Sequence, residues 1–222
     1  VLLGAALGNL LRGLPIGPTG KFSLAFFTDF RARGEVGILD WYTISVAVFT
    51  VICVAAHGAS YLVWRTEGAV HDRSLGLARK LWMVVFVLMP AITVATAVVR
   101  RELFMDMLDR PLAWLAVIVA VSGSLAIVAG QRRQHELMAF LGGCAFILGL
   151  LGAAAVSVFP VMLHSTFDPA HSVTAHAGAV GGAGLRIAIL WWPLAMAFSI
   201  GYGVYVFRQF SGKVRLAGPS PN

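Results

Sequence analysis

The sequence predicts an all-α integral membrane protein with five full transmembrane helices and the end of a truncated one. Of its 222 residues, 59% are apolar and only 12% are charged, whereas a soluble domain is about half apolar and about one-quarter charged. The mean hydropathy is +0.83. The apolar residues form runs long enough to cross about 30 Å of hydrocarbon, which takes about 20 residues per helix. This composition excludes a soluble domain, a disordered chain and a disulfide scaffold.

The chain starts with an apolar segment, residues 1–10, that is too short to cross a membrane and is interpreted as the end of a helix. Five longer runs follow. They are predicted to be helices because every backbone group in lipid needs an internal partner, and because they lack the alternation of barrel strands. The predicted spans are residues 39–64, 81–99, 111–130, 137–159 and 185–207, and residues 208–222 form a tail. We interpret residues 1–222 as one membrane domain.

The net charge of +7 is interpreted as an effect of basic residues that set membrane topology, and not as a sign of nucleic-acid binding. Basic residues concentrate in the loops and tail of one side of the membrane, where they also meet lipid headgroups, and the loop of residues 160–184 has none. The positive-inside rule therefore places the C-terminal tail in the cytoplasm and that loop outside. The basic residues of the cytoplasmic side are Arg65, Arg73, Arg79, Lys80, Arg132, Arg133, Arg208, Lys213 and Arg215.

Small residues recur at intervals of four in the fourth span, which predicts close approach of another helix. They are Ala145, Gly149, Ala153 and Ser157. The two cysteines, Cys53 and Cys144, lie in different apolar runs and have no metal or redox spacing, so we interpret them as small apolar residues.

None of the ten carboxylates lies in the middle of a predicted span. Ion-coupled transporters need an ionisable group at depth, and His57 is the one candidate. The sequence therefore disfavours an autonomous ion-coupled transporter. It also has no paired acids, no nucleophile with an adjacent base and no phosphate-binding loop.

His57 has two interpretations. It is a neutral histidine bonded to a neighbouring helix, or it is an axial haem ligand paired with Met89, which lies at a similar depth in the next span. The histidines of the last loop, His164, His171 and His176, lack the spacing of metal ligands. We interpret this loop as a cover over the helix ends, in which Asp168, Ser172 and Thr174 suit caps and turns.

Five separated motifs together resemble subunit II of the bacterial cytochrome bd quinol oxidases, including their cyanide-insensitive relatives. They are GNLLRGLP (Gly8–Pro15), LDWYT (Leu39–Thr43), HGASYLVWRTEG (His57–Gly68), FPVMLHSTFDPAHSVT (Phe159–Thr174) and VFRQFSGKV (Val206–Val214). Their order matches the C-terminal two-thirds of that subunit. The family-motif positions are Gly8, Asn9, Gly13, Pro15, Asp40, His57, Gly58, Tyr61, Thr66, Glu67, Arg73, Phe159, Pro160, Asp168, Ser172, Thr174, Gly212 and Lys213.

The resemblance implies a multi-pass subunit of the bacterial cytoplasmic membrane without catalytic or metal-binding residues. In this family, haems b558, b595 and d are held by subunit I, which also oxidises the quinol. The chain would then bind no cofactor and would support and shield subunit I during reduction of dioxygen to water, with or without small accessory subunits. This argues against His57 as a haem ligand. Two alternatives remain: an independent b-haem electron-transfer protein that uses His57 and Met89, and a small transporter or channel.

Overall fold

The computed structural model describes residues 1–21, 26–28, 30–31, 34, 36–178, 181–210 and 212–213. Two of the ten carboxylates (Asp29 and Glu35), two residues of the fifth motif (Ser211 and Val214) and the basic residue Arg215 lie outside these residues. The described helices are α1 (Leu2–Arg12), α2 (Trp41–Arg65), α3 (Ala69–Val99), α4 (Glu102–Leu108), α5 (Pro111–Arg132), α6 (Glu136–Val158) and α7 (Gly182–Gln209). Between α6 and α7 lie strand β1 (Val161–Leu163), a 3₁₀ turn (Pro169–His171) and strand β2 (Val173–Thr174), and the two strands pair antiparallel.

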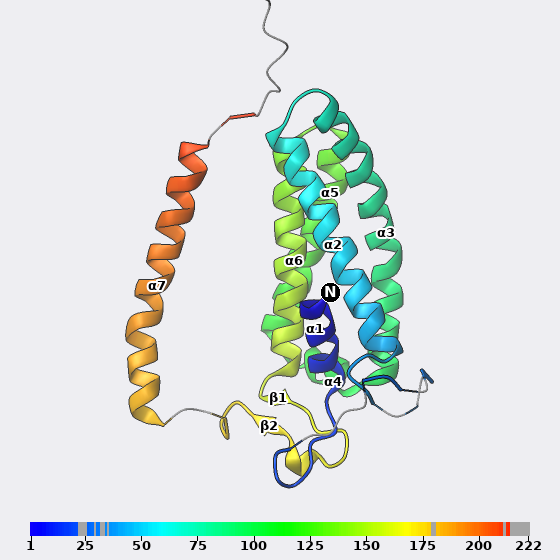
Figure 1. Ribbon diagram of the computed structural model, residues 1–222, viewed down its shortest axis with the longest axis vertical. Coiled ribbons are helices and arrows are strands. Elements are labelled where there is room, and N and C mark those ends of the chain that lie inside the picture. The colour runs from blue at the N-terminus through cyan, green and yellow to red at the C-terminus, as the bar shows by residue number, and fades with distance from the viewer. Residues whose placement is uncertain are drawn as a thin grey trace, which may run out of the picture.

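The predicted fold class is confirmed. Five helices, α2, α3, α5, α6 and α7, are long and apolar enough to cross a membrane. Helices α2, α3, α5 and α6 run side by side as a bundle, α1 packs beside part of α2, and α7 stands apart (Figure 1). The bundle has two ends. We call them the Asp40 end, where α2 begins and α6 ends, and the Glu136 end, where α2 ends and α6 begins.

Helix α3 differs from its predicted span because it begins at Ala69 rather than near residue 81. Residues 69–80 are too polar for the hydrocarbon core, so hydropathy alone leaves them out. They form a helix nevertheless, with Asp72 in the first turn, where an acid interacts favourably with the helix dipole. The short helix α4 lies between the predicted spans 81–99 and 111–130, in residues that neither span includes. Both α3 and α7 continue through an internal proline, Pro90 and Pro193 respectively.

Helices α5 and α6 meet backbone to backbone at glycines. A Cβ atom on Gly149 would lie 2.4 Å from the backbone nitrogen of Ala120, and one on Gly123 would lie 2.4 Å from that of Phe146. A Cβ atom on Gly130 would lie 2.5 Å from the backbone nitrogen of Ala139. The predicted small-residue stripe thus contributes Gly149 to a close helix contact, and the same contact uses glycines outside that stripe.

An aromatic cluster fills the bundle between α2, α3 and α6. Trp82 is buried, and its indole packs edge to face on Phe146 at 5.6 Å between ring centroids. The indole Nε1 donates a hydrogen bond of 2.9 Å to Ser60 Oγ, which itself donates to the Ala56 carbonyl at 3.0 Å. Both polar side-chain atoms in these contacts, Trp82 Nε1 and Ser60 Oγ, therefore have a hydrogen-bond partner, as buried polar atoms require. Cys53 lies in the same core as a free thiol.

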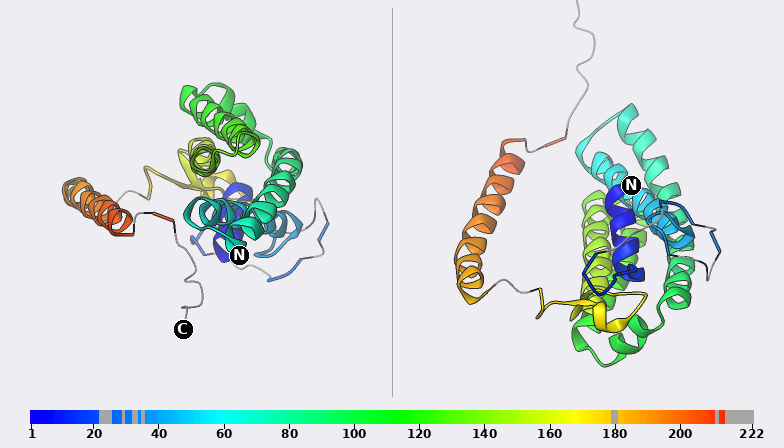
Figure 2. Two further views of the ribbon diagram at one scale, coloured as in Figure 1. Left: turned by 90° about the horizontal axis from the view of Figure 1, so that it is seen from above. Right: turned by 60° about the horizontal axis from the view of Figure 1, so that its bottom comes forward.

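Helix α7 stands away from the bundle in each of the views (Figures 1 and 2). None of its residues 182–209 is buried. Contacts just beyond its C-terminus join it to the bundle: the Arg65 guanidinium donates to the Phe210 carbonyl, and the Lys213 ammonium pairs with Glu136 at 2.7 Å. The helix therefore leaves nearly its whole apolar surface available to lipid or to another protein.

The contact between α5 and α6 predicts that Gly149→Ala destabilises the protein. Its methyl group has no room against Ala120, and overpacking costs about 1–3 kcal/mol. Thermal or denaturant unfolding in detergent, followed by circular dichroism, measures this loss. The matched control is Gly201→Ala on α7, where a Cβ atom would meet nothing within 4 Å. Equal stability of the two variants would contradict the backbone contact.

Candidate functional site

A buried ion pair connects the last residue of α1 to the cap of α2. The Arg12 guanidinium pairs with the Asp40 carboxylate, and the two side chains are only 6% and 1% exposed. Asp40 is also the N-cap of α2, because its Oδ1 accepts a 2.8 Å hydrogen bond from the Thr43 backbone N–H. The charge of Arg12 is favourable at a helix C-terminus, and that of Asp40 at a helix N-terminus. The pair therefore fixes how these two helix ends meet.

Neighbouring family-motif residues strengthen the same contact. Asn9 Nδ2 donates to the Ile38 carbonyl at 3.0 Å and to the Ala5 carbonyl at 3.1 Å. A Cβ atom on Gly8 would lie 3.0 Å from the Thr43 Cα atom, so α1 packs closely on α2. The first two motifs, separated in the sequence by the segment after α1, thus form one structural unit.

The fourth motif docks on the first through backbone hydrogen bonds. Gly13 has a φ of 98°, a conformation that favours glycine, and a Cβ atom there would lie 2.9 Å from the His164 carbonyl oxygen. The next residue, Leu14, donates its N–H to His164 at 2.8 Å and accepts from the Thr166 N–H at 2.9 Å. The glycine therefore brings the loop after α6 against the end of α1.

Ser165 organises this docked loop. Its side chain is 1% exposed, and its Oγ donates to the Ile16 carbonyl at 2.9 Å and accepts from the Asp168 N–H at 3.3 Å. The Ser165 N–H donates to Ser172 Oγ at 2.9 Å. Asp168 Oδ1 then accepts from the Ala170 N–H, and Thr174 Oγ1 accepts from the Ala177 N–H. These contacts fold residues 165–177 over the Asp40 end.

Two further arginines bind helix ends here. Arg110 donates to the carbonyls of Val156 and Phe159, at the C-terminus of α6, and Arg100 donates to the Leu11 carbonyl of α1 at 3.3 Å. Such carbonyls have no partner inside their helix. Burial lowers the pKa of His164, and the charge of Arg100 lowers it further, while Glu102 opposes the shift. Burial also lowers the pKa of Arg100.

His57 lies within the bundle against α6. Its ring stacks on Phe140 with 4.8 Å between ring centroids, and its Nε2 lies 3.9 Å from Cys144 Sγ. Its Nδ1 is buried and would lie 2.6 Å from a Cβ atom on Gly143. The α6 residues Gly143 and Cys144 thus lie against the two ring nitrogens. The proposed partner, Met89, packs against the apolar core.

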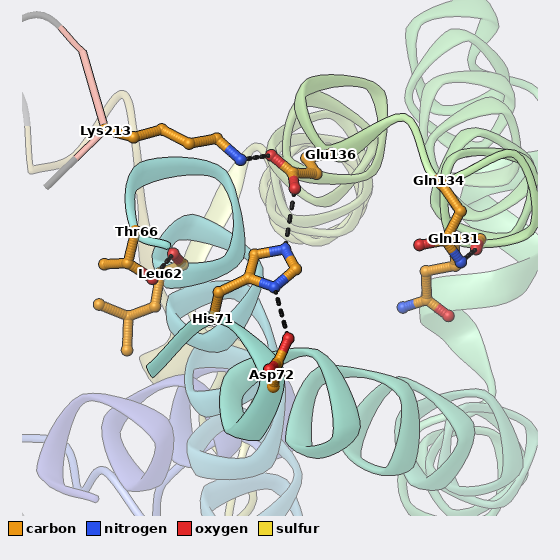
Figure 3. Close-up of polar contacts among 8 residues, drawn as sticks. All are labelled: Leu62, Thr66, His71, Asp72, Gln131, Gln134, Glu136 and Lys213. Atoms are coloured by element: carbon orange, nitrogen blue, oxygen red, sulfur yellow. Dashed lines mark hydrogen bonds and ion pairs between the residues drawn. The ribbon is translucent and has the colours of Figure 1, made fainter. Parts of the chain in front are cut away.

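A charged cluster ties together the Glu136 end (Figure 3). His71 contacts Asp72 at 3.1 Å and Glu136 at 2.9 Å, and Glu136 also pairs with Lys213 at 2.7 Å. Lys213 belongs to the fifth motif. The cluster thus joins the beginnings of α3 and α6 to the segment after α7.

The other motif residues lie at the same ends or on α2. Thr66 Oγ1 donates to the Leu62 carbonyl at 2.7 Å, and the Tyr61 ring packs 5.6 Å from that of Phe140. Pro15 is buried at the Asp40 end, where Pro160 accepts a hydrogen bond from the Ala175 N–H and Phe159 is exposed. Glu67 is partly buried, and Gly58, Arg73 and Gly212 are exposed.

Sequence reasoning missed Ser165, His71 and Glu136 as members of these clusters. Ser165 lies inside the fourth motif, but nothing in the sequence indicated its contact with Ile16, which is distant in the chain. Charged residues flanking the apolar runs could have suggested His71 and Glu136. Within the residues that the structure describes, no three His, Cys, Asp or Glu side chains are grouped for metal binding.

These features define a multi-pass helical membrane protein whose polar side chains join helix ends. Residues 1–210 match the family described as cytochrome bd terminal oxidase subunit II, and the chain belongs to that family. It is 24% identical over 212 residues to the cytochrome bd ubiquinol oxidase subunit 2 of Bacillus subtilis, covering 94% of this chain and 59% of that protein. It is 20% identical over 240 residues to the probable cytochrome oxidase subunit 2 of Haemophilus influenzae, covering 96% and 62%. The chain thus spans about three-fifths of these relatives.

The buried ion pair predicts that Asp40→Asn costs about 3–5 kcal/mol, because Arg12 keeps a buried charge without a partner. Chemical unfolding in detergent measures the loss. The double variant Arg12→Met/Asp40→Asn should recover part of it. The control is Asp106→Asn, which removes the exposed pair with Arg110 and should cost less than about 1 kcal/mol. Similar losses for the two single variants would contradict the pair's importance.

The lowered pKa of His164 predicts a pH dependence. The folded protein resists protonating this ring, whereas the unfolded chain takes up the proton near the ordinary value of about 6.5. Below that pH the unfolded state binds more protons, so stability should fall as the pH is lowered from 7.5 to 5. His164→Gln should make the melting temperature less dependent on pH. His176→Gln, at an exposed position of the same loop, should keep the wild-type slope. If His164→Gln left this slope unchanged, His164 would not be the source of the pH dependence.

Proposed function

We propose that the chain serves as a supporting subunit of a bd-type quinol:oxygen oxidoreductase. Family membership over residues 1–210 supports this role. The relatives from Bacillus subtilis and Haemophilus influenzae are named as subunits of oxidases. In this proposal, subunit I holds haems b558, b595 and d, oxidises the quinol and reduces dioxygen to water. The chain itself contributes no catalytic residue and no haem ligand.

The observation that carries the proposal is the exposure of α7. This apolar helix of 28 residues has no buried residue and adds nothing to the core formed by the described part of the chain. Its large side chains are open along the whole helix, with Leu190 78%, Phe198 71% and Tyr202 71% exposed. A second membrane subunit that packs on α7 gives this surface a structural role. We infer that α7 belongs to the contact with subunit I.

The physical contribution of such a subunit is exclusion of water. Apolar helices packed beside the redox centres of subunit I keep their surroundings at low dielectric, where electrostatic interactions are stronger. The ion pair and the hydrogen bonds at the Asp40 end hold the helices and the loop in place. The complex would be electrogenic without pumping, taking protons for water from the cytoplasm and releasing quinol protons outside.

We also propose that the chain lies in the bacterial cytoplasmic membrane with its Glu136 end and C-terminal tail in the cytoplasm. Basic side chains at the Glu136 end include Arg73, Arg79, Lys80, Arg132 and Arg133, all exposed. The positive-inside rule favours this orientation. The docked loop of residues 165–177 would then cover the outer face.

Tryptophan substitutions on opposite faces of α7 test the proposed role. Positions 197 and 199 lie about 200° apart on a helix, and both are exposed. Each variant is made in a tagged subunit, which is purified in mild detergent together with its partners. We expect one of Ala197→Trp and Ser199→Trp, the one whose ring faces the partner, to lower recovery of a haem-bearing membrane protein at least about tenfold. The other variant serves as the control, because lipid tolerates the larger ring.

Haem absorbance and quinol oxidase activity of the recovered material provide the readout. The absence of a haem-bearing partner with the wild-type subunit would overturn the proposed function. Full recovery with both variants would overturn α7 as the contact while leaving the function in place.

A further inference from the structure

An open apolar groove of about 510 Å³ lies between α5 and α6 toward the Glu136 end. This volume falls within the range of about 300–1,000 Å³ that is typical of small-molecule sites. Small side chains form its floor, and longer apolar side chains form its rim. Among them are Gly123, Ala126, Leu137, Leu141, Gly142 and Ala145.

The groove follows from the glycine contact between the two helices. A Cβ atom on Gly142 would lie 2.7 Å from the backbone nitrogen of Ile127, so the two backbones leave no room for side chains between them. The small residues on either side produce a trough. Its rim residue Leu141 is 53% exposed, whereas Ile127 and Phe146 face the buried core. The trough is therefore open on the outside of the bundle.

A basic turn lies at the polar end of this groove. Arg132 ends α5 and Arg133 follows it in the turn before α6; both are exposed, and His135 lines the groove itself. The turn is shaped by Gln134, whose φ is 55°, and by a 2.8 Å hydrogen bond from the His135 N–H to the Gly130 carbonyl. The nearby carboxylate of Glu136 pairs with His71 and Lys213 and does not line the groove.

We propose that this groove binds an anionic phospholipid. One acyl chain lies along the small residues of α5 and α6, and the phosphate headgroup lies at the turn, where Arg132, Arg133 and His135 interact with it. Charge complementarity decides the occupant: basic residues at a membrane surface attract anionic lipids, whereas the apolar floor accommodates a hydrocarbon chain. The site is independent of the proposed oxidase function.

Native mass spectrometry of the subunit, purified with its partners in mild detergent, tests the headgroup contact. Phosphatidylglycerol and phosphatidylcholine are titrated separately. Wild-type protein should prefer phosphatidylglycerol, and Arg132→Gln/Arg133→Gln should weaken that preference about thirtyfold, at about 1 kcal/mol for each basic residue. The matched control is Arg79→Gln/Lys80→Gln, which removes two exposed charges from α3 at the same end. An unchanged preference in the first variant, or an equal loss in the control, would overturn the proposal.

Filling the groove tests the acyl-chain contact. Ala145→Leu should weaken binding of both lipids at least about tenfold, because the chain loses its space, while Ala155→Leu, exposed on the same helix, should leave binding unchanged. A photoreactive amino acid at Ser122, on the groove wall, then identifies the occupant. A phospholipid adduct supports the proposal. A cross-link to a polypeptide would overturn it, as would normal lipid binding by Ala145→Leu.

Discussion

The ion pair between Arg12 and Asp40 is the interaction on which the Asp40 end depends. A charge buried to this extent is tolerated only with a partner and further hydrogen bonds, and Asp40 has both, since it also caps α2. By fixing the end of α1, the pair places Gly13 where the loop after α6 packs on it and Leu14 where that loop hydrogen-bonds its backbone. One electrostatic contact thus determines where two distant segments of the chain meet.

Different kinds of contact hold the segments together at the two ends of the bundle. At the Asp40 end the connecting side chains of Arg12, Asp40 and Ser165 are buried, so each needs a partner. At the Glu136 end the cluster of His71, Glu136 and Lys213 is partly exposed and joins the segment after α7, as does the hydrogen bond from Arg65 to the Phe210 carbonyl. Solvent weakens such pairs. The contacts of the Asp40 end therefore hold α1, α2 and the loop after α6 together. Those of the Glu136 end attach α7, which stays outside the core.

Sequence patterns predicted the membrane helices because apolar length is a direct requirement of the bilayer. They did not show that α3 begins before its predicted span, because residues 69–80 are helical but polar, and hydropathy reports only the hydrocarbon core. Asp40 and Asp168 were identifiable as family-motif positions, but the sequence did not show which residues they contact. The bond from Ser165 to Ile16 depends on tertiary docking of a loop, for which neither periodicity nor spacing gives a signal. Motif resemblance therefore identified residues, and only the fold showed which of them meet.

Hydropathy also fails to distinguish α7 from the α5–α6 pair, although their surroundings differ. Lipid tails are as apolar as leucine, so burial of apolar surface gives little drive for helices to associate within a membrane. Close packing instead depends on small residues that let backbones approach, as Gly123 and Gly149 do between α5 and α6. Helix α7 also has glycines, Gly201 and Gly203, but a Cβ atom on either would meet nothing within 4 Å. The same feature that joins α5 to α6 is thus present on α7, where the described part of the chain gives it no partner.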